Sequence, residues 1–325
     1  MTAMKTSPLV LVDGLMGSGK STTAQWLAAA LTRAGRPASW IHEQDIEHPI
    51  YRYGEAYAAS CAGAAACEAF HAVARRKWAA FATELAHART VTILESCLLQ
   101  TPVASMHMAR CSAGSIAAHV SETVEILRPL DPAVVYLAPR DPAATLERMR
   151  VARGDAFVDY LADLLRQTPY GHARPSVDGA ALDEAIAAHY GQQRALLAAL
   201  PLRTIDITAG PGDWPSARQA IARFLGMPPV ALEAAADGVA EPAQLAGRYR
   251  DTESDGRLEI AVRGDGLVLQ PLGTRLLPRG DDAFDLEGFS VRLTFERGGG
   301  PAERIHCAAR LAEFGKLWVR ESHGG

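Results

Sequence analysis

The chain has 325 residues, of which 48% are hydrophobic, and a formal net charge of -4 at pH 7. Because one hydrophobic core rarely grows beyond about 250 to 300 residues, this length predicts two domains. The weak negative charge supplies no overall positive field for a polyanion, which argues against nucleic-acid binding. We therefore expect a small-molecule partner.

The cysteines and the first apolar run exclude further classes of protein. The five cysteines are scattered and show no Cys-x-x-Cys spacing, which argues against structural zinc and favours a reducing compartment. The apolar run at residues 9–12 is too short for a signal peptide or a membrane span. We expect a cytoplasmic protein without a membrane partner.

In the first part of the chain, short apolar runs alternate with helical segments. Residues 8–12 form a continuous apolar run, which is typical of a strand buried on both faces of a parallel sheet. Residues 19–34 are alanine-rich with apolar residues on one helical face, and Gly35 is placed to end that helix. Two further strands are predicted at residues 38–42 and 91–94, and residues 50–89 between them are helical in composition.

The same alternation continues through the middle of the chain. Asp141 and Pro142 supply an N-cap and a first-turn proline for a helix that follows a predicted strand at residues 133–138. Further on, we predict a helix at residues 179–200, a fifth strand at 202–207 and a last helix at 213–225. This order predicts an α/β fold with a five-stranded parallel sheet.

A linker and a second domain follow. Residues 228–243 carry little periodic apolar signal, so we assign residues 1–227 to the first domain and residues 244–325 to the second. The second domain contains short alternating runs separated by turns, a pattern that predicts a small antiparallel barrel or sandwich. Its expected strands lie at residues 258–262, 267–270, 289–295, 305–311 and 317–319.

The segment from Gly14 to Ser21 matches the P-loop pattern G-x-x-x-x-G-K-[ST] at every specified position, and it lies between a predicted strand and a predicted helix. Glycine permits the backbone path that turns successive N–H groups toward phosphate oxygens, and the helix N-terminus adds a positive end. Lys20 is expected on the β- and γ-phosphates, and the Ser21 hydroxyl is an expected Mg²⁺ ligand. We predict that ATP is bound by Gly14, Met16, Gly17, Ser18, Gly19, Lys20, Ser21 and Thr22.

The wider segment from Val12 to Thr23 resembles the opening of thymidylate kinases and related P-loop kinases of nucleosides and nucleotides. The order of elements agrees with theirs through about residue 226. The resemblance implies a P-loop NTPase fold and phosphoryl transfer that depends on ATP and Mg²⁺. A Ras-like GTPase is not expected, because its guanine-binding signature needs asparagine and the sequence contains none.

Glu95 is the first candidate catalytic residue outside the loop. It follows the apolar run at residues 91–94, and ligands of doubly wound sheets bind at the carboxyl ends of such strands. There a carboxylate can hold Mg²⁺ or accept the proton of an attacking hydroxyl, as in the resembled kinases. Those kinases usually place arginine directly after this carboxylate, whereas Ser96 and Cys97 follow here.

Further candidates lie after the second strand and after the fourth. Glu43 and Asp45 could each face the acceptor, and we prefer Asp45 by a small margin over Glu43. Arg148 and Arg153 lie on and just beyond the helix that begins at Asp141, where the resembled kinases carry lid arginines. Lid guanidinium groups neutralise charge during transfer and exclude water. The alternatives are an ordinary polar loop and a solvated basic helix face.

The start of the second domain, Leu-Ala-Gly-Arg-Tyr at residues 245–249, is followed by strands and by turns at 263–266 and 279–282. Together they resemble the small lipocalin-like domains appended to some serine hydrolases. No pattern in this domain provides a base, a nucleophile or metal ligands, so we assign it no chemistry. Ligand binding, homo-oligomerisation and capping of an acceptor pocket remain open.

Two functions fit these features. The first is an ATP-dependent kinase of a small molecule, which is a nucleoside, a nucleotide or the hydroxyl of an antibiotic or metabolite, with Glu95 or Asp45 as the base. The second is a nucleotide-driven ATPase or switch whose C-terminal domain binds a partner protein or ligand. The predicted arginine lid and the helical segment at residues 50–89 favour the kinase, because related kinases build their acceptor pocket in that segment.

Overall fold

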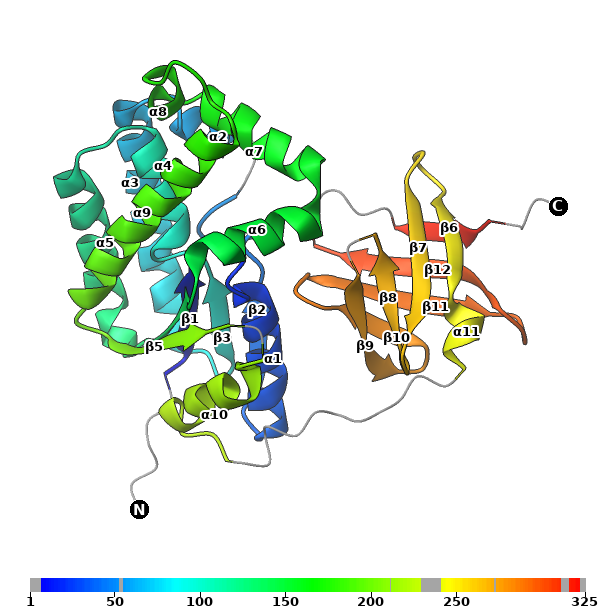
Figure 1. Ribbon diagram of the computed structural model, residues 1–325. Coiled ribbons are helices and arrows are strands. Elements are labelled where there is room, and N and C mark those ends of the chain that lie inside the picture. The colour runs from blue at the N-terminus through cyan, green and yellow to red at the C-terminus, as the bar shows by residue number, and fades with distance from the viewer. Residues whose placement is uncertain are drawn as a thin grey trace. The chain divides into compact units, whose positions relative to one another are not determined.

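The computed structural model describes residues 7–52, 55–210, 212–228, 241–271, 273–310 and 316–321. The chain divides into two compact units, one of residues 1–44 with 48–233 and the other of residues 45–47 with 234–325. The first unit is α/β and the second is a β-barrel (Figure 1). Most of the predicted linker lies outside the described residues.

The first unit alternates strands and helices along the chain. Its strands are β1 (Leu9–Gly14), β2 (Ala38–Ile41), β3 (Val91–Glu95), β4 (Ala133–Pro139) and β5 (Arg203–Ala209). Its helices are α1 (Lys20–Arg33), α2 (Glu55–Ser60), α3 (Ala64–Leu85), α4 (Gln100–Met108), α5 (Ala113–Leu127), α6 (Pro142–Arg153), α7 (Asp155–Arg166), α8 (Pro169–His172), α9 (Gly179–Ala198) and α10 (Trp214–Phe224), with a 3-10 helix, η1, at Arg128–Leu130. Among the described residues, no helix has the length and apolar content needed to cross a membrane.

The sheet of this unit has the strand order β2-β3-β1-β4-β5, and every pairing in it is parallel. The predicted five-stranded parallel sheet is therefore confirmed. Because the strands are parallel, their carboxyl ends lie at one edge of the sheet. The chain crosses from one side of β1 to the other between β3 and β4, and ligands of such sheets bind at this point. Val12 of β1 is paired with Glu95 of β3, which places Glu95 level with the start of the P-loop.

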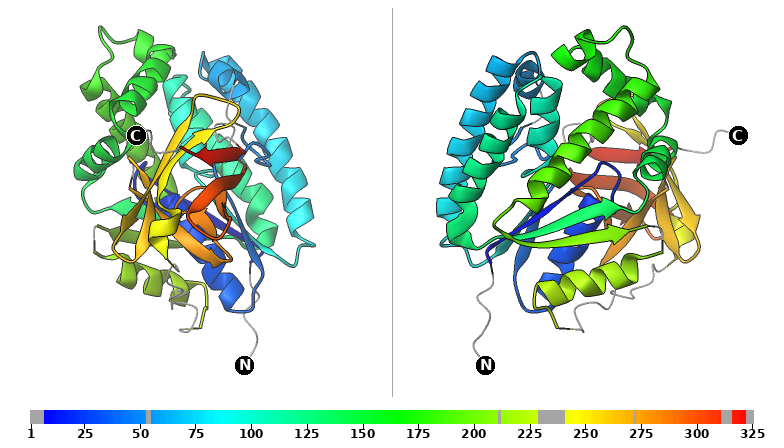
Figure 2. Two further views of the ribbon diagram at one scale, coloured as in Figure 1. Left: turned by 90° about the vertical axis from the view of Figure 1, so that its right-hand side faces the viewer. Right: turned by 60° about the vertical axis from the view of Figure 1, so that its left-hand side comes forward.

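Alternate residues of the central strands enter two separate cores, one on each face of the sheet. In β1, Leu9 and Leu11 pack with residues of α3, α4, α5 and α9, whereas Val10 and Val12 pack with α1 and α10. All four side chains are at most 2% exposed. Figures 1 and 2 show these two groups of helices on opposite faces of the sheet. Burial on both faces explains why β1 is an uninterrupted apolar run.

The segment between β3 and β4 forms α4 and α5, where no element was predicted. Six of the nine residues of α4 are buried, and they include Gln100, Thr101 and Ser105 as well as apolar residues. An amphipathic helix is recognised in a sequence by apolar residues that repeat every three to four positions. A helix that is buried around most of its surface does not show this pattern. α5 begins after Ser112, whose hydroxyl accepts a hydrogen bond from the Ser115 N–H as an N-cap.

The second unit is a closed barrel formed by the described strands β6 (Gly247–Asp251), β7 (Arg257–Arg263), β8 (Gly266–Gln270), β9 (Thr274–Gly280), β10 (Ala283–Leu286), β11 (Val291–Arg297), β12 (Ala302–Ala309) and β13 (Leu317–Arg320), after the short helix α11 (Pro242–Leu245). Each strand pairs antiparallel with the next, and β13 pairs with β6. The predicted barrel is confirmed and the sandwich is excluded. The expected end of one strand, Leu311, lies outside the described residues.

The inside of the barrel is filled by side chains from all around the wall. Tyr249, Phe284, Phe295 and Trp318 are each at most 5% exposed, and Phe295 makes edge contacts with the rings of Tyr249 and Phe284. Leucine, isoleucine and valine side chains complete this core. The unit is therefore held together by its own hydrophobic core.

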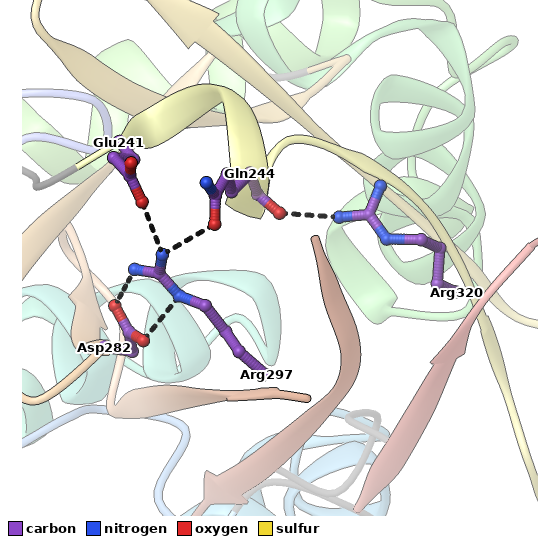
Figure 3. A network of polar contacts seen from close by, with 5 residues as sticks. All are labelled: Glu241, Gln244, Asp282, Arg297 and Arg320. Carbon is purple, nitrogen blue, oxygen red and sulfur yellow. Dashed lines mark hydrogen bonds and ion pairs between the residues drawn. The ribbon is translucent and has the colours of Figure 1, made fainter. Parts of the chain in front are cut away.

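Two arginines hold the segment around α11 at one end of the barrel (Figure 3). Arg320 donates hydrogen bonds to the Gln244 carbonyl oxygen at 3.0 Å and to the Tyr249 hydroxyl at 2.7 Å. Arg297 donates to Gln244 Oε1 at 3.1 Å and forms an ion pair with Asp282. Both guanidinium groups are partly buried, so their contacts are less screened than those of exposed pairs.

Candidate functional site

The P-loop connects β1 to α1 along a path that depends on its glycines. Gly17 and Gly19 have φ angles of 78° and 87°, in the left-handed region that favours glycine. Gly14 has no room for a side chain, because a Cβ atom there would lie 2.2 Å from the Leu137 carbonyl oxygen of β4. No described side chain caps the N-terminus of α1. Its first backbone N–H groups can therefore bind an anion.

The side chains of the loop also fit a polyphosphate. Lys20 is 6% exposed, and its Nζ donates a hydrogen bond to the Leu15 carbonyl oxygen across the loop at 3.0 Å. The buried Ser18 hydroxyl has no hydrogen-bond partner among the described residues. A phosphate oxygen could accept from both groups, which would satisfy the Ser18 hydroxyl and pair the Lys20 charge.

Glu95 ends β3 beside this loop and is fully buried. Its Oε1 accepts a hydrogen bond from the Glu43 N–H at 3.3 Å and lies 3.4 Å from His42 Nε2. Because His42 Nδ1 accepts from the Gln44 N–H at 3.0 Å, we assign the ring proton to Nε2, facing Glu95. Glu95 Oε2 has no well-formed hydrogen bond among the described residues.

The environment of Glu95 favours its neutral form. Burial, with a smaller contribution from the Glu43 carboxylate, raises the pKa of Glu95 to about 8, while Lys20 and Ser21 partly oppose the shift. A cation beside Glu95 would restore the carboxylate. Within the described chain, no group of three or more His, Cys, Asp or Glu residues could hold a metal. Ser21 and Glu95 nevertheless fit Mg²⁺, which keeps several waters and phosphate oxygens as ligands.

Asp13, just before the loop, was not among the predicted site residues. It is 1% exposed, and its carboxylate accepts hydrogen bonds from the N–H groups of Leu99 and Gln100 at 2.8 and 2.9 Å. Burial is the main reason that the pKa of Asp13 is raised, and these hydrogen bonds oppose it. Asp13 therefore fixes the start of α4 relative to the P-loop. A carboxylate at the end of a buried strand was the available sequence signal.

The two carboxylates that follow β2 have different neighbours. The Glu43 carboxylate is close enough to Glu95 to raise its pKa. Asp45 is grouped with the second unit, where it accepts from the Glu47 N–H at 2.8 Å and pairs with Arg310 at 2.6 Å. Glu43, which was the second choice, is thus the neighbour of Glu95. The catalytic role of Asp45 stays a prediction.

Helix α6 packs directly against the P-loop and carries both predicted lid arginines. A Cβ atom on Gly17 would lie 3.2 Å from Met149 Cβ of this helix. Arg148 donates a hydrogen bond to Thr145 Oγ1 at 2.7 Å, and the Arg153 guanidinium lies 5.1 Å from the centre of an aromatic ring in α7. Both arginines are exposed to solvent. Their contact with phosphate groups stays a prediction.

Trp214, at the start of α10, is another residue that sequence analysis missed. Its indole ring would lie 2.8 Å from a Cβ atom on Gly19, so the ring packs against the loop glycine. The preceding Asp213 forms an ion pair at 2.7 Å with Arg140, which follows β4. No pattern in the sequence places Trp214 beside the loop, because this contact exists only in the folded chain.

Two solved structures match part of this chain at low sequence identity. YorR protein from Bacillus subtilis, solved in complex with phosphorylated GDP, is 14% identical, with 66% of this chain and 93% of that chain covered and a TM-score of 0.35. Deoxyadenosine kinase from M. mycoides with bound dATP is 10% identical, with 66% and 98% covered and a TM-score of 0.40. No protein-family model matches the chain, and no curated protein matches it in sequence. Our assignment of the fold rests on the P-loop and the strand order.

Proposed function

We propose that the first unit binds ATP with Mg²⁺ and transfers the γ-phosphoryl group to the hydroxyl of a nucleoside, a nucleotide or an antibiotic or other metabolite. The observation that carries this proposal is Glu95. It is a fully buried carboxyl group with a pKa of about 8 at the end of β3 beside the P-loop, within reach of Ser21 and Lys20. A strongly perturbed acid at such an edge indicates chemistry in addition to nucleotide binding.

The residues around the loop have distinct roles in this proposal. Lys20 pairs with the β- and γ-phosphates, and Arg148 and Arg153 close over them from α6. Ser21 and Glu95 would hold Mg²⁺, which neutralises charge on the phosphate oxygens when it is bound. As a base, Glu95 would take the proton of the attacking hydroxyl, and a pKa near neutrality suits that task.

The nucleobase of ATP has a candidate position beside Trp214. Its ring packs against Gly19 at the loop, and the preceding residue, Asp213, is held by an ion pair with Arg140. We therefore propose that adenine contacts the indole ring, because flat aromatic surfaces favour stacking.

The second unit has no catalytic role in this proposal. Its closed eight-stranded barrel supports a lipocalin-like domain, but Tyr249, Phe284, Phe295 and Trp318 fill its interior. A ligand inside the barrel is therefore disfavoured. The unit would act through its outer surface, by oligomerisation or by contact with a partner, and the alternative ATPase or switch would use the same surface.

The test compares Glu95→Gln, Glu43→Gln and Asp45→Asn with the wild type, using an acceptor found by screening nucleosides, nucleotides and aminoglycosides. If Glu95 is the base, Glu95→Gln should still bind ATP while turnover falls by about a hundredfold or more. If Glu95 positions the metal, added Mg²⁺ should partly restore turnover. Wild-type turnover in Glu95→Gln would exclude both roles, and a loss confined to Asp45→Asn would identify Asp45 as the base.

A further inference from the structure

A pocket of about 530 Å³ lies in the first unit between the end of α4, α8 and α9. Its lining residues are His107, Arg110, Cys111, Tyr170, Ala173, Arg174 and Gln192. None of them belongs to the P-loop or to the carboxylates at the ends of β2 and β3. Pockets of about 300 to 1,000 Å³ hold small organic ligands, so this one is large enough for a mononucleotide.

Two arginines give this pocket its charge. Arg110 is exposed, and it occupies the turn after α4 with a φ of 58°. Arg174 lies over the Tyr170 ring, 3.5 Å from its centre, and pairs with Glu184 at 2.9 Å. The Glu184 side chain is 67% exposed, so it can move into solvent when another anion binds Arg174. Guanidinium groups bind phosphate with paired hydrogen bonds.

The remaining lining residues offer flat rings, an imidazole and a side-chain amide. The rings of His107 and Tyr170 are 4.8 Å apart between centres. His107 and Gln192 lie within hydrogen-bond reach of each other, and this contact partly opposes the effect of burial on the pKa of His107. Burial lowers the pKa of His107, which keeps the ring neutral at neutral pH. Such groups suit the edge and face of a nucleobase.

We propose that this pocket binds a phosphate monoester that carries a flat ring, of the size of a nucleoside monophosphate. The phosphate lies between Arg110 and Arg174, and the ring lies beside Tyr170 and His107. The proposal concerns a site apart from the P-loop and does not depend on phosphoryl transfer at that loop.

The test is calorimetric titration of the full chain with AMP, GMP, CMP and UMP in turn. A non-hydrolysable ATP analogue and Mg²⁺ are kept at saturation, so that the P-loop is filled. Arg110→Gln should weaken binding by about tenfold or more, because it removes a charge-assisted contact. Glu184→Gln should strengthen binding severalfold, because it releases Arg174. Arg128→Gln, which changes an exposed arginine of η1, is the matched control and should leave affinity unchanged.

Opposite effects of the variants at positions 110 and 184 separate a binding role from a general loss of stability, and thermal melts of each variant check the fold. The proposal is overturned if none of the four mononucleotides binds, or if one binds with an affinity that neither variant changes. Inorganic phosphate that binds as tightly as the best mononucleotide would overturn the assignment of a ring-bearing ligand.

Discussion

At the scale of single residues, Glu95 and Glu43 form an unequal pair of carboxyl groups. Glu95 is fully buried, whereas Glu43 is only partly buried and contributes to the raised pKa of its neighbour. A proton held by Glu95 in the ligand-free protein relieves the repulsion between them. Binding of Mg²⁺ and ATP would release that proton, so nucleotide binding at this site should depend on pH.

The pKa of Glu95 also predicts how stability changes with pH. The folded protein holds a proton on Glu95 up to about pH 8, whereas the unfolded chain loses it near pH 4.5. The contribution of this group to stability is therefore complete below pH 4.5 and declines as the pH rises to 8. The Glu95→Gln variant has no titratable group at this position, so it does not lose this contribution as the pH rises. From pH 4.5 to pH 8 its free energy of unfolding should therefore increase by more than about 1 kcal/mol relative to that of the wild type.

Urea unfolding of both proteins at pH 5 and pH 8 without metal measures this difference. Glu84→Gln, on the exposed face of α3, is the matched control. A difference between Glu95→Gln and wild type that is the same at both pH values would show that Glu95 is ionised throughout.

Candidate site residues could be proposed from the sequence where a local pattern specifies them. Lys20 and Ser21 follow from the P-loop, and Glu95 follows from its place at the end of a buried strand. The choice between Glu43 and Asp45 was not predictable, because it depends on the direction that the chain takes after β2. Trp214 was missed for the same reason, since its contact with the loop exists only in the folded chain.

At the scale of elements, the strands of the parallel sheet were easier to predict than those of the barrel. β1, β3 and β4 are buried along their whole length and form continuous apolar runs. Three of the seven residues of β9 are exposed, and β10 is only four residues long. β9 also contains Pro278 and Gly280, which are more typical of a turn than of a strand. α4 was not predicted because it is buried around most of its surface, so its apolar and polar residues do not alternate with the spacing of an amphipathic helix.

The end of the barrel provides a test at this scale. A Cβ atom on Gly247 would lie 2.2 Å from Arg320 Nη1, and Arg320 also donates to the Ala246 carbonyl oxygen at 2.8 Å. Gly247→Ala should therefore displace this guanidinium and destabilise the barrel by about 1 to 3 kcal/mol. Gly266→Ala, where a Cβ atom meets nothing within 4 Å, is the matched control.

The loss of stability can be measured as the rate of backbone hydrogen exchange, by mass spectrometry of peptides from β6 and β13. Faster exchange is expected in Gly247→Ala and not in Gly266→Ala. Equal protection of these strands in all three proteins would show that Arg320 has no part in closing the barrel.

At the scale of the whole molecule, each unit has its own hydrophobic core. The clusters of the first unit draw only on residues up to Met227, and the barrel cluster begins at Leu245. Deletion of residues 244–325 should therefore leave a folded unit that binds ATP with near-wild-type affinity. Circular dichroism and calorimetric titration with ATP measure both properties, and a truncated chain that is unfolded or cannot bind ATP would contradict this division.

The central claim is phosphoryl transfer at the P-loop, and the fate of the γ-phosphate of labelled ATP tests it most directly. The full chain is incubated with γ-labelled ATP, Mg²⁺ and a panel of nucleosides, nucleotides and aminoglycosides. We predict that the wild type places the label on an acceptor and that Lys20→Ala does not, because that variant loses the side-chain charge on the β- and γ-phosphates. Label released only as inorganic phosphate, whatever acceptor is present, would contradict a kinase and indicate an ATPase. Equal transfer by Lys20→Ala would contradict the role of the P-loop itself.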